Sequence, residues 1–144
     1  MFKHILIATD GSEVATRAVS AGLKLAKKLA ARVVVMTASE PLPATVIAET
    51  IAANFPEAYE RASKESAEKI LGEVRAEALK LGVDCETLQV TNFPAEAIIE
   101  TAKANACDLI VMGSHGRRGI ARLWLGSQAT KVVTLSSVPV LVCR

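Results

Sequence analysis

The segment from Val111 to Lys131, VMGSHGRRGIARLWLGSQATK, combines glycines with basic residues and contains no acidic residue. Gly113 and Gly116 permit positive φ angles and let a ligand approach the backbone closely. Gly126 and Ser127 stand where a helical pattern begins, and the free N–H groups at the start of a helix attract anions. The chemistry that these residue types favour is the binding of a phosphate or another anion.

Side chains in the same segment strengthen this interpretation without deciding it. Three arginines, Arg117, Arg118 and Arg122, can donate charge-assisted hydrogen bonds to an anion. Ser127 either caps the following helix or donates its hydroxyl to a phosphate oxygen. The alternative is that the glycines only turn the chain and start a helix. The residues alone leave both interpretations open.

Two common phosphate signatures and a catalytic set are absent from the sequence. No GxxxxGK[ST] motif occurs, which argues against Walker-type phosphoryl transfer, and no GxGxxG follows the first apolar run, which argues against a dinucleotide site. His115 has no nucleophile or second carboxylate at a suitable spacing, so we expect a ligand contact there and no catalytic residue. Asp10 is able to coordinate Mg²⁺, but we favour a base or ribose contact and predict no dedicated metal site.

Short apolar runs alternate with helix-period segments along the chain, and these elements must position the segment above. Five runs are predicted to be strands: His4–Asp10, Arg32–Ala38, Cys85–Thr91, Cys107–Gly113 and Val138–Arg144. Helices are predicted from the N-cap Ser12 to about Ala30, over Glu57–Leu81, Pro94–Ala104 and Ser127–Leu135, with a short helix within 45–53. This alternation predicts a single domain, 1–144, of the α/β class.

The predicted architecture is a three-layer open sheet of five parallel strands with helices on both faces. Parallel strands require crossover helices, and these cover the two faces of the sheet. The class is Rossmann-like and includes the adenine nucleotide alpha hydrolase-like proteins. In such sheets ligands bind beyond the carboxyl ends of the strands, where the strand order reverses. We therefore expect the site at 9–12, 38–40, 91–93 and the loop after Met112.

Composition argues against several other classes. The formal net charge of +2 is too small to indicate a nucleic-acid binder. No apolar run approaches the roughly 18 residues of a membrane span, and the run after Met1 is too short for a signal peptide. Three cysteines without CxxC spacing indicate neither a disulfide framework nor a zinc site. We expect a cytoplasmic protein that binds neither nucleic acid nor membranes.

The spacing of the glycine segment also carries a family resemblance. GSHGRRGIARLWLGS fits the pattern G-x2-G-x9-G-[ST] and resembles the nucleotide-binding branch of the universal stress proteins. The stretches HILIATDGSE, CDLIVMGSHGR and VPVLVCR are similar to that family as well, so the resemblance covers the whole chain. It implies a five-stranded parallel sheet, ATP or another adenine nucleotide in the cleft, with or without Mg²⁺, and a homodimer.

The resemblance also implies which residues contact the nucleotide. Four residues would hold phosphates, mostly through backbone groups: Gly116, Gly126, Ser127 and Gln128. Three at the end of the first strand would contact ribose and base: Ala8, Thr9 and Asp10. Ala38 would meet the adenine edge through its backbone, and the ribose side would be lined by Met112 and Gly113, with His115 nearby.

Two residues depart from the family pattern. Gln128 stands where a small aliphatic residue is common, so its side chain would aid or crowd a phosphate. Trp124 replaces an aliphatic residue and would pack against a partner. Neither change removes the glycines. We further expect that Gly126→Val blocks phosphate binding and leaves the fold intact.

The resulting hypothesis is an ATP-binding stress-response protein that acts as a sensor or regulator, with at most slow ATP hydrolysis. The alternatives are an interaction module of the same fold with an empty cleft, and an ATP-pyrophosphatase-type enzyme. The latter requires a Ser-Gly-Gly loop after the first strand, where this sequence has TDGSE. The apolar edge strand Val138–Arg144 is the predicted homodimer contact, because an exposed strand edge tends to pair with another strand.

Overall fold

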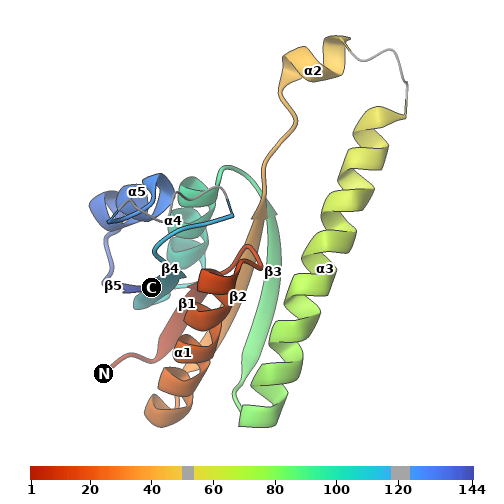
Figure 1. Cartoon of the computed structure of the whole chain (residues 1–144). Helices are drawn as coiled ribbons and strands as arrows, with labels where there is room; N and C mark the ends of the chain where they lie inside the picture. Colours follow the sequence, from red (N-terminus) through yellow and green to blue (C-terminus); the bar gives the residue numbers. More distant parts are fainter. Residues whose placement is uncertain (50–53, 118–123) are drawn as a thin grey trace.

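The computed structural model describes residues 1–49, 54–117 and 124–144. Within these residues the sheet has five strands, all paired in parallel: β1 (His4–Ala8), β2 (Arg32–Ser39), β3 (Cys85–Thr91), β4 (Leu109–Gly113) and β5 (Val140–Cys143). The strand order is β3-β2-β1-β4-β5 (Figure 1), so the predicted fold class is confirmed. The order reverses between β1 and β4, which is the point where sheets of this kind bind ligands.

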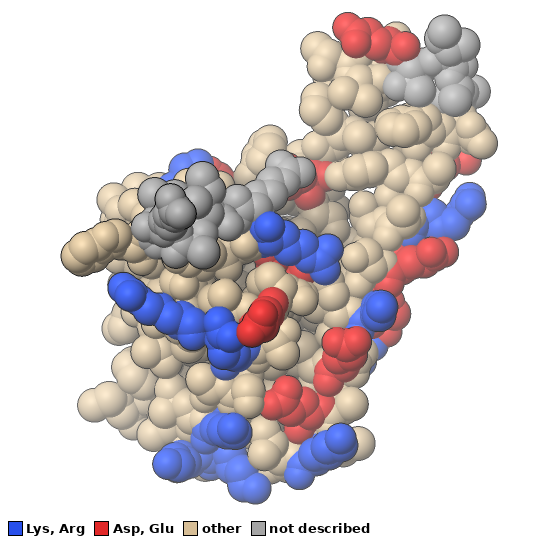
Figure 2. Space-filling view, viewed as in Figure 1, with Lys and Arg blue, Asp and Glu red and all other residues tan. Residues whose placement is uncertain are grey.

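Helices cover the two faces of this sheet. α1 (Glu13–Leu29) and α3 (Phe55–Leu81) pack on one face, and α4 (Pro94–Ala104) and α5 (Ser127–Leu135) pack on the other. The short α2 (Ala44–Glu49) and the first turns of α3 project beyond the sheet (Figure 1). Figure 2 shows acidic and basic side chains mixed along α3, with few charges at the projecting end. Among the described helices, none combines the length and the apolarity needed to cross a membrane.

The core consists of two aliphatic layers, one on each face of the sheet. Alternate residues of the central strands supply them: Ile7 and Val35 point toward α1 and α3, and Leu6 and Val34 point toward α4 and α5. Because both faces are buried, the strands are continuous apolar runs instead of alternating ones. Each of these four side chains is at most 1% exposed.

The strand and helix ends differ slightly from the prediction, for identifiable reasons. β1 ends at Ala8 instead of Asp10, because side chains of the next two residues bind the following backbone N–H groups and start a turn. β4 begins at Leu109 instead of Cys107, since the carboxylate of Asp108 binds the N–H groups of Lys3 and His4.

At the other ends, β5 begins at Val140 instead of Val138, after a turn in which Ser136 and Val138 exchange two hydrogen bonds. β2 runs one residue further than predicted, to Ser39, and α3 begins two residues earlier, at Phe55. The short helix predicted within 45–53 is observed as α2, which ends at Glu49. Residues 50–53 lie outside the described residues.

Candidate functional site

A cleft of about 400 Å³ opens at the carboxyl ends of β1, β2 and β4, on the side of the sheet that α4 and α5 cover. Each residue that the family resemblance assigned to the nucleotide lines this cleft: Ala8, Thr9, Asp10, Ala38, Met112, Gly113, His115, Gly116, Gly126, Ser127 and Gln128. Of the wider ranges expected from the strand ends, residues 11–12, 39 and 91–93 do not line it, and α4 contributes Pro94 and Ile98 instead. The volume of the cleft lies within the range of small-molecule sites, about 300–1,000 Å³. The structure therefore brings all of the assigned residues to one place.

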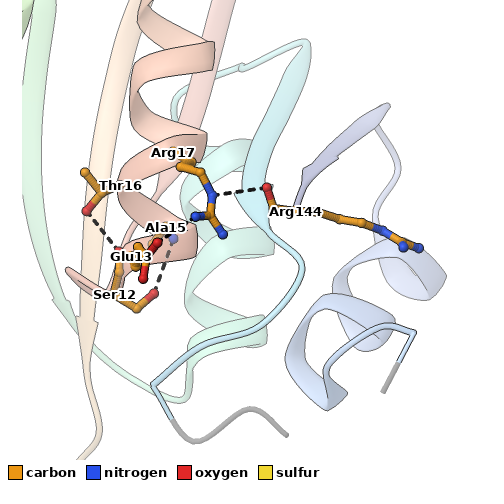
Figure 3. Close-up of polar contacts among 6 residues, drawn as sticks. All are labelled: Ser12, Glu13, Ala15, Thr16, Arg17 and Arg144. Carbon is orange, nitrogen blue, oxygen red and sulfur yellow. Dashed lines mark hydrogen bonds and ion pairs between the residues drawn. The ribbon is translucent and has the colours of Figure 1, made fainter. Parts of the chain in front are cut away.

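The turn that leaves β1 is fixed by its own side chains. The Thr9 hydroxyl accepts a hydrogen bond from the N–H of Gly11 at 3.2 Å, and Asp10 Oδ1 accepts one from the N–H of Ser12 at 2.9 Å. Ser12 in turn caps α1, because its hydroxyl accepts from the N–H of Ala15 at 3.2 Å (Figure 3). The predicted cap is confirmed, and it holds Asp10 at the edge of the cleft.

The first turn of α1 is also tied to the end of β5. Arg17 Nε donates to the carbonyl oxygen of Arg144 at 3.2 Å, and Arg17 Nη1 donates to Glu13 Oε1 at 2.8 Å (Figure 3). These groups are exposed to solvent, so we expect a contribution to stability of at most about 1 kcal/mol. Their effect is to align the start of α1 with the carboxyl end of the last strand.

Asp10 links the β1 turn to the glycine segment. Its Oδ2 accepts a hydrogen bond from the backbone N–H of Arg117 at 2.9 Å. A Cβ added to Gly116 would lie 2.9 Å from the same oxygen, so this carboxylate packs directly against the glycine backbone. The family resemblance implies that the Asp10 carboxylate contacts ribose and base. In the structure this carboxylate also anchors the loop.

The two ends of the loop between β4 and α5 meet at Gly126. Its N–H donates to the carbonyl oxygen of Ser114 at 2.8 Å, and an added Cβ would lie 2.9 Å from that oxygen. The expectation that Gly126→Val leaves the fold intact is therefore wrong, because a side chain here would collide with backbone and push the loop ends apart. Gly126 is needed for this contact whether or not a phosphate binds.

The first turn of α5 faces the cleft without a side-chain cap. Gly126 is the N-cap residue, in an extended conformation, and Ser127 is the first residue of the helix. The possibility that Ser127 caps α5 is therefore excluded. Its side chain is exposed and makes no hydrogen bond with the described residues. The N–H groups of this turn and the Ser127 hydroxyl are available to an anion.

Gln128 uses its side chain on the neighbouring helix. Its Oε1 accepts a hydrogen bond from the backbone N–H of Ala95 at 3.1 Å, and α4 has no side-chain cap from its own N-cap residue, Phe93. The side chain thus neither points freely into the cleft nor blocks it. Trp124 is 86% exposed, so its predicted contact with a partner stays a prediction.

The described part of the cleft is lined by two carboxylates, Asp10 and Glu40, and one arginine, Arg117. Lys131 Nζ lies 2.6 Å from Glu96 Oε1, and this hydrogen bond from Lys131 lowers the pKa of the Glu96 carboxyl. Arg117 is the one cationic residue among the described residues that line the cleft, and no described carboxylate forms an ion pair with its guanidinium. The predicted contributions of Arg118 and Arg122 fall on residues outside the described part of the chain.

His115 is oriented by the residue before it. The hydroxyl of Ser114, which is 2% exposed, lies 2.9 Å from His115 Nδ1. The N–H of Ser114 donates to the carbonyl oxygen of Cys143 at 2.7 Å, so the pair is attached to the end of β5. In the described residues no three His, Cys, Asp or Glu side chains gather closely enough to hold a metal ion.

Comparison with known proteins gives the family. Residues 1–144 match the sequence model of the Universal stress protein family. The chain belongs to this family. A universal stress protein from Thermus aquaticus, in the 3′ region of QAH/OAS sulfhydrylase, is 44% identical over 146 residues, with 100% of both chains covered.

Solved structures of similar proteins share the fold over nearly the whole chain. The protein MJ0577 of Methanocaldococcus jannaschii matches with a TM-score of 0.82 and 28% identity, covering 99% of this chain and 96% of that one. A universal stress protein crystallised in complex with cAMP matches with a TM-score of 0.75 and 28% identity, covering 99% and 97%.

The cleft of this universal stress protein has an apolar wall that the sequence did not reveal. Met36 at the end of β2 and Pro94 and Ile98 on α4 line it. Pro94 and Ile98 are four residues apart at the start of a helix, and a helix presents such residues on one face. That spacing was the available signal, since α4 was already expected to begin at this edge of the sheet.

Proposed function

We propose that this universal stress protein binds ATP or another adenine nucleotide in the cleft and acts as a sensor or regulator in the stress response. The observation that carries the proposal is the uncapped first turn of α5, which opens into the cleft beside Gly116 and the carboxyl end of β1. The similar protein crystallised with cAMP supports the choice of an adenine nucleotide.

The phosphate end of the cleft fits its proposed ligand. Backbone N–H groups at Ser127 and Gln128 belong to a helix start, where partial positive charge favours an anion. The guanidinium of Arg117 adds a full positive charge beside them. Gly116 leaves space next to Asp10 that a Cβ would fill, which permits close approach of phosphate or ribose oxygens.

The base end is supported by the backbone at the end of β2. The N–H of Thr9 donates to the carbonyl oxygen of Met36 at 2.9 Å, and beyond it β1 turns away. Ala38 lies two residues further along β2, so its N–H and C=O point in the same direction as those of Met36. Among the described residues no partner takes these groups, which matches the donor and acceptor edge of adenine.

Hydrolysis of the bound nucleotide is proposed to be slow. The described residues of the cleft offer groups that position phosphates, and His115 Nδ1 is already engaged with Ser114. Asp10 Oδ1 and Oδ2 each accept one backbone N–H and keep a further lone pair, so Asp10 is compatible with Mg²⁺ held by the nucleotide. Nothing in this set activates a water molecule strongly.

Mass spectrometry of small molecules released from the purified protein tests the proposal, together with calorimetric titration of ATP, AMP and cAMP. We expect an adenine nucleotide to be retained or to bind saturably. If none of the three binds, the alternative of an interaction module with an empty cleft replaces this proposal. The preference among the three is an outcome of the same titration.

A homodimer through β5 is part of the proposed function. β5 lies at the edge of the sheet, and Leu141 on it is 40% exposed. The carbonyl oxygens of Pro139 and Cys143 accept hydrogen bonds from the β4 side, so the alternate residues Val140 and Val142 direct their backbone groups outward. These groups are suited to pairing with β5 of a second copy.

A further inference from the structure

A second cavity, of about 360 Å³, lies on the opposite side of β2 from the cleft, between the end of that strand and the first half of α3. Its lining combines hydroxyl groups with a small apolar floor: Thr37, Ser39, Tyr59, Ser63, Ser66, Ala62, Ala67 and Ile70. Asp10, Ala38 and Arg117 line this cavity as well as the cleft, so the two are neighbours.

The side chain of Thr37 points into this cavity. Along β2, Val33 and Val35 belong to the core layer beneath α1 and α3, and Thr37 continues that alternation toward α3. Thr37 is 5% exposed, and its hydroxyl forms no hydrogen bond within the described part of the chain. Solvent reaches this hydroxyl through the cavity, so it is free to form a hydrogen bond with a ligand that displaces the water there.

The guanidinium of Arg117 stands at the mouth of the cavity. A Cβ added to Gly11 would lie 3.0 Å from Arg117 Nη2 and 2.9 Å from Ile70 Cγ1, which puts the charged group close to the cavity floor. The two oxygens of Asp10 are directed at backbone N–H groups, and Asp10 forms no ion pair with this guanidinium. No carboxylate in the described ranges forms an ion pair with it, so it can bind an anionic group.

The remaining hydroxyl groups are arranged for a ligand that itself carries hydroxyls. The Tyr59 hydroxyl donates to the carbonyl oxygen of Glu40 at 2.7 Å, which fixes its position and leaves its oxygen as an acceptor. Ser39 accepts a hydrogen bond from Gln89 at 3.1 Å and can still donate. Ser63, on the face of α3 that lines the cavity, is half-buried and has no partner among the described residues.

We propose that this cavity is a second binding site, for a small hydroxylated anion of the size of a sugar phosphate. Arg117 binds the anionic group, and Thr37, Ser63 and the Tyr59 oxygen bind the hydroxyls of the ligand, whose carbon skeleton lies on Ile70. A volume of about 360 Å³ holds such a molecule and falls in the range of known small-ligand sites. The site goes beyond the proposed nucleotide cleft, with which it shares Asp10, Ala38 and Arg117.

Calorimetric titration with ribose 5-phosphate, and with glycerol 3-phosphate as a smaller probe, tests the proposal on the full chain. We expect saturable binding of at least one probe. Ser63→Phe fills the cavity from the surface of α3 and should abolish it. Thr37→Val should weaken binding about tenfold, the effect of one lost hydrogen bond. Thr101→Val is the matched control, because Thr101 is 7% exposed on α4 and lines neither cavity.

The nucleotide cleft must be separated from the second site, since its helix start also attracts phosphate. Ser127→Glu puts a carboxylate at that helix start, outside the cavity, and should leave binding of the probes unchanged. The proposal is overturned if Ser127→Glu abolishes binding of the probes while Ser63→Phe leaves it unchanged. It is also overturned if neither probe binds to the parent chain. If the chain binds no ATP, the proposed function is disproved, but titration with the two probes still tests the second site.

Discussion

The side chain of Gln128 accepts a hydrogen bond from the backbone N–H of Ala95 at 3.1 Å and so joins the first turn of α5 to the first turn of α4. α4 begins at Pro94 and has no cap from its own sequence. Gln128 therefore replaces the missing cap of α4, although it lies 33 positions away from Ala95 in the sequence. Both helices line the cleft, so this bond joins two parts of its wall.

Gln128→Ala is expected to lower the free energy of unfolding by about 0.5–2 kcal/mol, the usual effect of losing a helix cap. Gln128→Glu keeps the accepting oxygen and should retain most of the stability, but its charge beside the first turn of α5 should weaken ATP binding. Urea unfolding and ATP titration of both variants measure the two effects. An alanine variant as stable as the parent would show that the bond to Ala95 contributes nothing.

Gly113 is expected to tolerate no side chain. A Cβ there would lie 3.0 Å from Val14 Cγ1 and 3.2 Å from the backbone nitrogen of Ala15, at the start of α1. Gly113→Ala should therefore cost about 1–3 kcal/mol of stability, as overpacking against backbone does. Gly72→Ala is the control: it is on α3, the nearest atom is 3.8 Å away, and it should stabilise the protein by about 0.5–1 kcal/mol. If the urea midpoints of Gly113→Ala and Gly72→Ala move in the same direction relative to the parent, this explanation is contradicted.

Asp108 is expected to contribute to the loss of stability in acid. Burial raises the pKa of its carboxyl, but hydrogen bonds from the N–H groups of Lys3 and His4 outweigh that effect and hold the pKa below its usual value. A lowered pKa in the folded state stabilises the protein above the pKa of the unfolded chain, and this stability is lost as the pH falls through the folded value. Asp108→Asn should therefore be less stable at neutral pH and lose less stability than the parent below about pH 4. Urea unfolding at several pH values measures this, and parallel curves would refute it.

The proposed dimer predicts different outcomes for proline at two adjacent positions. Val142 directs its backbone N–H away from β4, so Val142→Pro should fold and sediment as a monomer at micromolar concentration. Leu141 faces β4 through its backbone, so Leu141→Pro should lose a hydrogen bond within the sheet and be markedly destabilised. A parent chain that is itself monomeric at this concentration would end the dimer proposal.

Patterns among neighbouring residues predicted the helices and strands, but they could not predict contacts between residues far apart in the sequence. Ser12 marks a helix start by residue type alone, and it caps α1 as expected. The hydrogen bond between Asp10 and Arg117 joins residues 107 positions apart, and no local pattern could reveal it. The later start of β4 has the same cause, since Asp108 binds the N–H groups of Lys3 and His4, which are 105 and 104 positions away.

The cleft was predictable in outline, and the second cavity was not. Carboxyl ends of parallel strands meet at one edge of the sheet, so residues such as Ala38 and Met112 had to lie close together. The second cavity depends on how α3 sits on β2, and on which of its residues are small where the two meet. Ser63 and Ala67 on the helix have no signature that distinguishes a cavity wall from an ordinary packing face.

The measurement that tests the central claim most directly is calorimetric titration of ATP into the parent chain and into Ser127→Glu. A carboxylate in the first turn of α5 suits the helix and should leave the urea midpoint unchanged or higher, while it repels phosphate at the proposed site. We predict saturable binding of one ATP per chain in the parent and binding at least about tenfold weaker in the variant. Absence of ATP binding in the parent, or equal affinity in the two proteins, would contradict the account.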